Sequence, residues 1–322
     1  MSDRKFVTEF ALNSVVSKHL LLQQDSLDDI EGILKENNFN PHIYFICKRP
    51  RVTIKPNSLK ITEDTIEIVF KQQIQDQYTE IPIRAKNHQL RTDYKLNTEY
   101  PYTEFEILEA NGEVLLSGKS SILLQKILQG DKPQLTDLEV LYVGQSFGLN
   151  GSRDASDRLK SHSTLQNIYA EAINKSPDSE IWLIISSFEN PFLLIHIDGR
   201  AKNCTSTLED DDEHINEVIS HKMNEQQKVN FTEAALIRYF QPRYNKIYKD
   251  TFPDPNHVTY SECYSIDLNT ISVELQTEEL SARLWSDNRP PSDLHFCIFP
   301  LHSRSEREYM FEFARLGEDP AK

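Results

Sequence analysis

The chain has 322 residues, so it can bury sizeable hydrophobic cores, and at roughly 150 residues per domain this length predicts two or three of them. Hydrophobic residues make up 38% of the sequence and charged residues 26%, a composition that excludes a mainly disordered chain. The net charge of −15 argues against a protein that is basic over its whole surface, although a local basic region would still bind phosphate.

The sequence contains no apolar run of about 18 residues, which a membrane-spanning helix needs, and its first residues do not resemble a secretory signal. The four cysteines, Cys47, Cys204, Cys263 and Cys297, are far apart and form no CxxC pair. This spacing favours reduced thiols over a disulfide framework or a thiolate zinc site. We therefore expect a cytoplasmic protein without a membrane partner.

Residues 1–119 predict a β-rich N-terminal domain with a helical start. Apolar residues between Phe6 and Leu22 form an amphipathic pattern, and a second short helix is expected after Asp25 or Ser26. From His42 onward the pattern changes to short β-rich runs separated by turn signals: HIYFICK, RVTIK, TIEIVFK, EIPIR, TEFEIL and EVLLS. Such alternation suits a half-exposed antiparallel sheet or small barrel that binds or docks a partner.

Residues 120–250 predict an α+β unit. LEVLYVGQS is typical of a buried strand, and a polar loop leads from it into a helix at about 157–174. IWLIISSF and PFLLIHID are apolar strands, and the acidic run LEDDDEH is expected in a loop. The helix FTEAALIRYF, with Thr232 as its cap, should end before Pro242 because proline cannot continue it.

Residues 251–322 predict a small α+β region with strands at VTYSECYSID, TISVELQ and HFCIFP, followed by a charged helix in SEREYMFEFARL. This region holds thirteen Asp and Glu against six Lys and Arg, so it is the most acidic of the three. The predicted fold class is thus α+β, with domains at 1–119, 120–250 and 251–322.

Several side chains of the middle region suit phosphodiester chemistry. Arg158 and His162 are four residues apart on one helix and share a face, where a guanidinium can hold a phosphate and an imidazole can handle a proton. Glu233, on a later helix, is a carboxylate of the type that holds a hard divalent cation.

YVGQS, RLKSH and EAALIRYFQPRYN follow one another in an order that resembles the second half of the GIY-YIG nuclease pattern. The resemblance covers about 120–250 and implies a small antiparallel sheet flanked by helices. It implies that Tyr142 and Arg158 surround the scissile phosphate and that Glu233 binds Mg²⁺ or Mn²⁺. It further implies that Asn245 orders the site, and that His162 is an additional active-site histidine, for which an exposed histidine without a role is the alternative.

One element of that family pattern is absent from the middle region. The family begins with a strand bearing GIY, whose tyrosine accepts a proton, and the strand expected here is SSILLQKIL, which has leucine at that place. Tyr142, His162 or a metal-activated water could take over as the base. Gly144 is expected to allow a tight backbone turn beside the site. The alternative is a degenerate module that binds without catalysis.

Two stretches carry basic residues without an acidic one and could follow a phosphate backbone, or be ordinary solvated faces. Their candidate nucleic-acid contacts are Lys48, Arg49, Arg51 and Lys55 in the first, and Arg238, Arg243 and Lys246 in the second. The sequence therefore predicts a metal-dependent nuclease, with DNA favoured over RNA. Its rival is an inactive GIY-YIG-like module that binds nucleic acid or serves as a protein scaffold through the N-terminal domain.

Overall fold

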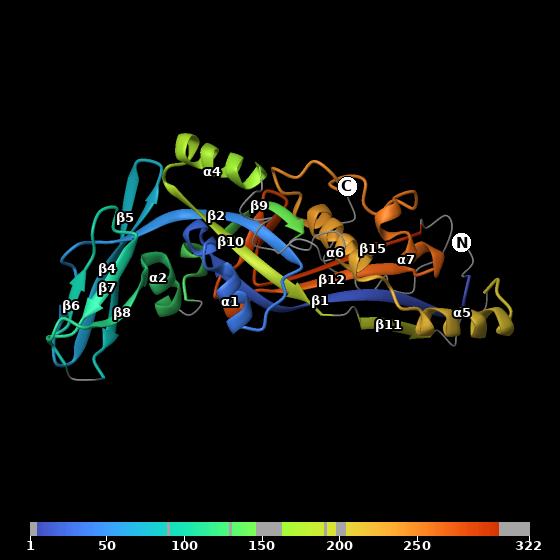
Figure 1. Ribbon diagram of the computed structural model, residues 1–322, viewed down its shortest axis with the longest axis horizontal. Coiled ribbons are helices and arrows are strands. Elements are labelled where there is room, and N and C mark those ends of the chain that lie inside the picture. The colour runs from blue at the N-terminus through green and yellow to red at the C-terminus, as the bar shows by residue number, and fades with distance from the viewer. Residues whose placement is uncertain are drawn as a thin grey trace.

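The computed structural model describes residues 5–88, 91–128, 131–145, 163–189, 192–197 and 204–302 (Figure 1). Its strands are β1 (Thr8–Leu22), β2 (Ile43–Ile54), β3 (Lys60–Ile61), β4 (Thr65–Ile74), β5 (Gln77–Lys86), β6 (Lys95–Asn97), β7 (Glu104–Leu108), β8 (Val114–Lys119), β9 (Leu138–Gln145), β10 (Ser179–Phe188), β11 (Phe192–Ile197), β12 (Thr270–Gln276), β13 (Leu284–Ser286), β14 (Arg289–Ser292) and β15 (Leu294–Pro300). Its α-helices are α1 (Ile30–Glu36), α2 (Ser120–Leu128), α4 (Ser163–Lys175), α5 (Leu208–Ser220), α6 (Glu225–Phe240) and α7 (Glu262–Ser265). Short 3-10 helices are η1 (Gln24–Leu27), η2 (Pro133–Leu135), η4 (Val258–Tyr260) and η5 (Glu278–Leu280).

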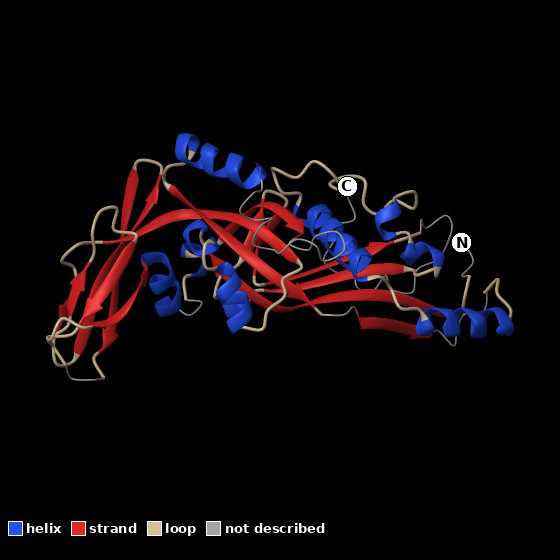
Figure 2. Cartoon of the chain, viewed as in Figure 1, coloured by secondary structure: helices blue, strands red, loops and turns tan. Residues whose placement is uncertain are grey.

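This mixture of sheet and helices confirms the predicted α+β class in its general form (Figure 2). The largest sheet runs in the order β14-β13-β9-β2-β10-β1-β12-β15, while β11 pairs with β1 and β4 pairs with β2. Most neighbours are antiparallel, but β1 with β12 and β9 with β13 are parallel. Strands from 1–119, 120–250 and 251–322 alternate along this order, so one sheet is shared by all three predicted ranges.

The two faces of β2 enter different cores. Ile43, Phe45 and Cys47 are fully buried in a core that includes much of α6. Tyr44 and Ile46 point to the opposite face, where they pack with residues of α1 and α4. The alternation follows from the pleat of a strand, in which successive side chains leave on opposite sides. A central strand covered on both faces explains why residues 43–47, IYFIC, form an unbroken apolar run.

The predicted helical start is wrong for residues 8–22, which form β1, whereas the short helix expected after Asp25 or Ser26 is confirmed by η1 and α1. Its first half is hydrogen-bonded to both β11 and β12, and its second half to β10. The first seven residues of β1 are buried, so the apolar spacing reflects two covered faces rather than one face of a helix. Val15 and Val16 also favour a strand, because β-branched side chains lose less freedom there.

Four further predictions of secondary structure are wrong. SSILLQKIL is the helix α2, and the segment predicted as the strand VTYSECYSID contains η4 and α7. LEDDDEH begins α5 instead of lying in a loop, because Thr207 caps it and three acidic side chains in its first turn favour a helix N-terminus. Thr232 lies inside α6, whose cap is Asn224.

Residues 60–128, which hold β3 to β8 and α2, form what we call the arm, at the left of Figure 1. The rest of the described chain is called the body. Within the arm, β4 pairs with β5, and β6, β7 and β8 form a separate sheet. These strands confirm the predicted runs TIEIVFK, EIPIR, TEFEIL and EVLLS. The arm therefore lies in sequence between β2 and β9, which are neighbours in the large sheet.

Among the helices that the structure describes, none combines the length and the apolar character needed to cross a membrane.

Candidate active site

Two tyrosines meet where β2 and β9 pair. The antiparallel register sets Tyr44 opposite Gly144 and Ile46 opposite Tyr142. Tyr44 and Tyr142 are therefore diagonal neighbours on one face of the sheet, with ring centroids 5.9 Å apart and the planes inclined by 35°. Tyr44 is 1% exposed, and Tyr142 is half-buried. Two phenol groups from strands far apart in the sequence thus meet at one place.

Gly144 makes this meeting sterically possible. A Cβ atom at residue 144 would lie 2.7 Å from the Tyr142 ring and 2.7 Å from the hydroxyl oxygen of Tyr44. Contacts this short are repulsive, so any other residue would push the rings apart. Gly144 lies inside β9 without a positive φ, which corrects the expectation of a tight turn. Glycine is needed here for space rather than for backbone freedom.

Tyr44 is a residue that the sequence reasoning missed. SSILLQKIL, the segment expected to form the strand beside Tyr142, is α2 and does not pair with β9. The available signal was the tripeptide His42-Ile43-Tyr44 at the start of a strongly apolar strand. Residues 45–141, including the whole arm, separate the two tyrosines in sequence, so no local pattern shows that they pair.

Glu233 belongs to helix α6 and lies next to Gln145, the last residue of β9. The side-chain amide of Gln145 donates to the Glu233 carboxylate at 2.6 Å and to the Oδ1 atom of Asn230 at 2.8 Å. Gln226 donates in turn to Gln145 at 3.1 Å and to Asn230 at 3.0 Å. This amide cluster therefore holds Glu233 in position beside the strand that carries Tyr142.

Asn245 completes the open edge of β9. Its side-chain amide accepts a hydrogen bond from the Val143 N–H at 2.9 Å and donates to the Val143 carbonyl at 2.8 Å. The Tyr244 N–H also donates to the Leu141 carbonyl at 3.0 Å. Asn245 is 8% exposed, so it substitutes for a neighbouring strand where β13 no longer reaches. Its contribution to the site is to order β9.

Three of the predicted site residues therefore attach to residues 142–145 of β9, although the Tyr142 ring packs against the core on the opposite face of the sheet from α6. Tyr142 belongs to this stretch, Asn245 bonds to Val143, and Glu233 accepts from Gln145. Arg158 and His162 lie outside the described residues. The helix predicted at about 157–174 is confirmed from Ser163 onward as α4.

The donor set at Glu233 suits a hydrated hard cation. No group of three or more His, Cys, Asp or Glu side chains that could enclose a metal ion occurs in the described part of the chain. Mg²⁺ keeps several waters and is usually held by only one or two carboxylates together with substrate oxygens. A single carboxylate that accepts from the Gln145 amide therefore fits a hydrated Mg²⁺ or Mn²⁺ and does not fit a closed structural metal site.

The prediction that Arg49 binds phosphate is wrong, because its side chain is buried. It is 2% exposed, and its guanidinium donates to Glu180 at 2.8 Å and to Gln125 at 2.6 Å. The same group stacks over Trp182, with 4.6 Å to the ring centroid. An arginine enclosed in this way cannot reach a nucleic acid. The acid-free stretch around Arg49 did not indicate this burial, because the partners of Arg49 come from α2 and β10.

The other basic candidates divide into paired and open ones. Lys48 pairs with Glu139 at 3.1 Å and Lys55 with Glu80 at 2.8 Å. In the second stretch, Arg238 pairs with Asp250 at 3.2 Å. Arg243 and Lys246 are exposed, and Arg243 lies over the Tyr244 ring, whereas Arg51 lines a cavity described below. A surface for phosphate would thus depend on Arg51, Arg243 and Lys246.

Comparison with known proteins identifies no relative: no protein-family model, no curated protein and no solved structure matches this chain.

Proposed function

We propose that the chain is a metal-dependent nuclease of the GIY-YIG type that hydrolyses phosphodiester bonds, with DNA as the favoured substrate. The pairing of Tyr44 with Tyr142 across Gly144 is the observation that carries this proposal. It gives the strand bearing YVG an antiparallel neighbour that bears an Ile-Tyr pair, which the sequence pattern lacked. Glu233 and Asn245 attach to the same end of β9.

The proposed roles follow from position and charge. Tyr142, the more accessible tyrosine, would orient or deprotonate the attacking water. Tyr44 would hold the Tyr142 ring in place through their contact. Glu233 would hold Mg²⁺ or Mn²⁺, which when bound stabilises negative charge on the phosphate oxygens. Arg158 would stabilise the same charge from the segment before α4, and His162 would assist proton transfer. Asn245 acts by keeping β9 in place.

The test is cleavage of plasmid, linear duplex, single-stranded DNA and RNA in Mg²⁺ or Mn²⁺, with wild type, Glu233→Gln and Tyr44→Phe. Glu233→Gln keeps an oxygen that can accept from Gln145, so the fold should be retained while cleavage falls at least about 100-fold. Glu225→Gln is the matched control, because Glu225 lies on the same helix and is 62% exposed. Its cleavage should equal that of wild type.

Cleavage by Glu233→Gln at the wild-type rate would remove the proposed mechanism. Absence of cleavage by folded wild-type protein on all four substrates would remove the proposed activity. Thermal unfolding of each variant establishes that a loss of cleavage is not a loss of fold.

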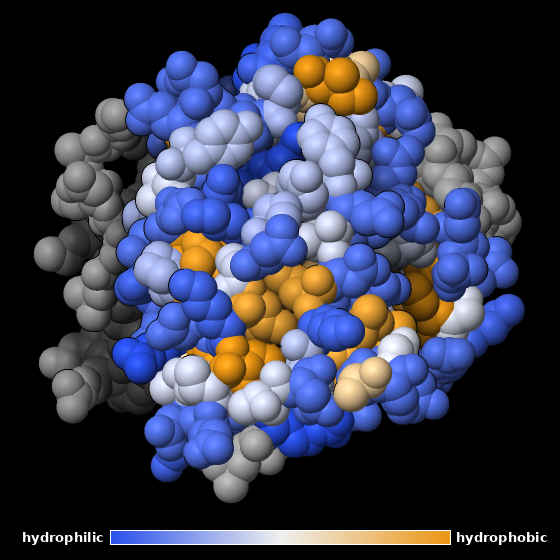
Figure 3. All heavy atoms as spheres, turned by 90° about the vertical axis from the view of Figure 1, so that its left-hand side faces the viewer, coloured by the Kyte–Doolittle hydropathy of each residue, from blue (hydrophilic) through white to orange (hydrophobic). Residues whose placement is uncertain are grey.

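A second function, that of an inactive scaffold, is favoured by the surface of the arm. β8 is an edge strand whose Val114, Leu115 and Leu116 are 53%, 52% and 46% exposed. Figure 3 shows apolar surface at this end of the molecule. Exposed apolar residues on an unpaired strand edge are typical of protein-binding surfaces. Affinity for DNA that falls steeply with salt would favour the nuclease, because counterion release accompanies phosphate binding.

A further inference from the structure

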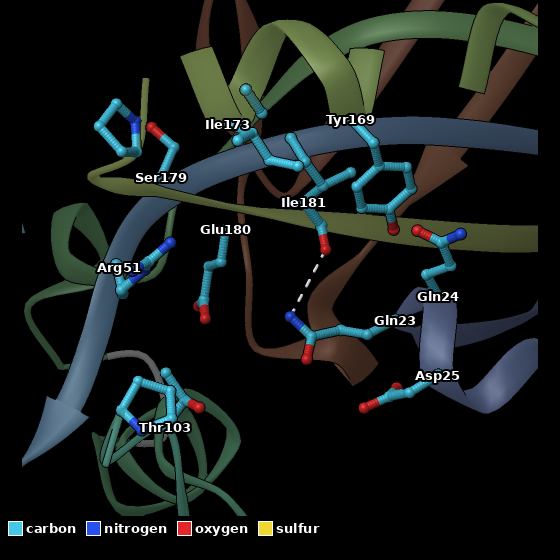
Figure 4. Close-up of a pocket in the computed structure, with 13 residues that line it drawn as sticks. Gln23, Gln24, Asp25, Arg51, Thr103, Tyr169, Ile173, Ser179, Glu180 and Ile181 are labelled. Atoms are coloured by element: carbon cyan, nitrogen blue, oxygen red, sulfur yellow. Dashed lines mark hydrogen bonds between the residues drawn. The ribbon is translucent and has the colours of Figure 1, made fainter. Parts of the chain in front are cut away.

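A cavity of about 450 Å³ lies between the body and the arm, away from the tyrosine pair. Its walls come from η1, the end of β2, the C-terminal half of α4, the start of β10 and the loop before β7 (Figure 4). A volume of this size is within the range of small-molecule sites. The two ends of the cavity differ in chemistry, which restricts what it can hold.

Arg51 supplies one end of the cavity with an available positive charge. Its side chain makes no hydrogen bond and no ion pair with any residue that the structure describes, whereas its backbone N–H donates to Asp178. The two carboxylates that line the cavity already have cationic partners: Glu180 pairs with Arg49 at 2.8 Å, and Asp25 pairs with Lys119. An anionic group can therefore approach Arg51 without meeting an uncompensated negative charge.

Tyr169 supplies the other end with an aromatic ring. The hydroxyl oxygen is buried beside the Gln24 backbone, so the ring and not the hydroxyl is open to a ligand. Ile173 and Ile181 add an apolar wall between the two ends. Figure 4 shows Arg51 at one end of the cavity and Tyr169 with Gln24 at the other. The ring of Tyr169, which lines the cavity, offers a flat apolar surface to a ligand.

From this arrangement we infer that the cavity binds one nucleotide, with its phosphate on Arg51 and its base against Tyr169. Arginine recognises phosphate through its fork of N–H groups, and aromatic rings stack on bases of any sequence. Inorganic phosphate would occupy only the Arg51 end and would leave the Tyr169 ring and the apolar wall uncovered. A nucleotide has the length, the charge and the flat apolar surface that the cavity offers together.

The cavity is connected to the candidate active site through α4. Leu165 and Ile168 of this helix pack in the same core as Tyr44, and both Tyr142 and Tyr169 pack against that core. If the proposed nuclease function holds, the nucleotide belongs to the substrate strand, and the cavity selects DNA with an unpaired segment beside the cleavage site. This last step rests on the proposed function, whereas nucleotide binding itself does not.

Binding is measured by titration calorimetry without metal ions, using the full chain carrying Glu233→Gln. The probes are thymidine monophosphate, thymidine and inorganic phosphate. We expect thymidine monophosphate to bind at least 10-fold more tightly than either part alone. Arg51→Ala and Tyr169→Leu should each weaken this binding at least 10-fold, while Tyr169→Phe loses less because it keeps the ring. Arg84→Ala is the control, since Arg84 is an exposed arginine of β5 outside the cavity.

Failure of thymidine monophosphate to bind at millimolar concentration would overturn the inference, as would equal binding by folded Arg51→Ala. Binding of phosphate as tight as that of the nucleotide would also overturn it, because the base would then contribute nothing. Competition with a single-stranded oligonucleotide shows whether the nucleotide can belong to a strand. Because metal and cleavage are absent from the assay, its result is independent of the nuclease test.

Discussion

The body and the arm are built from strands in different ways. In the arm, each strand of the main ladders pairs with a strand close by in the sequence: β4 with β5, β6 with β7, and β7 with β8. In the centre of the body, β9, β2, β10, β1 and β12 are neighbours although the chain visits them in another order. The arm is consequently a local structure, and the candidate active site depends on strands that meet only when the whole body has folded.

The two regions also differ in how deeply their strands are covered. β2 and β10 are buried along most of their length, whereas every residue of β8 except the last is exposed. Burial of a large apolar side chain contributes about 1.5–3 kcal/mol. Most of the stability should therefore reside in the body, and substitutions should separate the two regions clearly.

The largest effect is expected for Arg49→Ala at the junction of body and arm. This change removes a guanidinium that bonds to Glu180 of β10 and to Gln125 of α2, and it leaves a carboxylate that is 10% exposed without its partner. Losing one member of a buried ion pair costs about 3–5 kcal/mol. Urea unfolding measures this loss of stability. Lys48→Ala is the control, because Lys48 forms a partly exposed ion pair with Glu139. A loss for Arg49→Ala no larger than that of the control would contradict the buried role.

A smaller effect, dependent on pH, is expected from His295 of the body. Burial lowers the pKa of His295 to about 4 from its ordinary 6.5. Below pH 6.5, His295 binds a proton in the unfolded chain but stays neutral in the folded chain. The free energy of unfolding therefore falls as pH drops from about 6.5 to about 4. The full loss is on the order of 3 kcal/mol, and above pH 6.5 the group has no effect.

His295→Gln should flatten this pH dependence, measured as the free energy of unfolding at pH 7 and pH 4.5. The dependence will not vanish, because burial also lowers the pKa of His19 and His42. An unchanged slope in the variant would mean that the His295 ring is not buried in the folded protein.

The smallest effect is expected in the arm, for Leu115→Ala. Leu115 is 52% exposed, so its truncation should change the free energy of unfolding by no more than about 0.5 kcal/mol. The same truncation at Leu275 in β12, which is 1% exposed, should cost about 2–5 kcal/mol. Thermal and urea unfolding of the two variants compare the regions directly. Equal losses would show that β8 is covered in solution, as an interface would require.

The sequence by itself determined the elements whose pattern is strong and local. IWLIISSF, TISVELQ and the strand bearing YVG form where they were predicted, as does most of the helix that carries Glu233. It also indicated Tyr142, Glu233 and Asn245, which the fold brings to one end of β9. Local propensity and apolar runs suffice for such elements, because their neighbours do not alter the preference.

Only the tertiary structure decided that 8–22 is a strand, that Arg49 is buried, and that Tyr44 partners Tyr142. Each depends on a contact with a segment far away in sequence: β10 to β12 for β1, Glu180 for Arg49, and β9 for Tyr44. An apolar run fits a helix or a doubly covered strand equally well until its neighbours are known. The arm lies between β2 and β9 in sequence and so increases the distance along the chain between Tyr44 and Tyr142. No local sequence pattern could therefore indicate that these two strands pair.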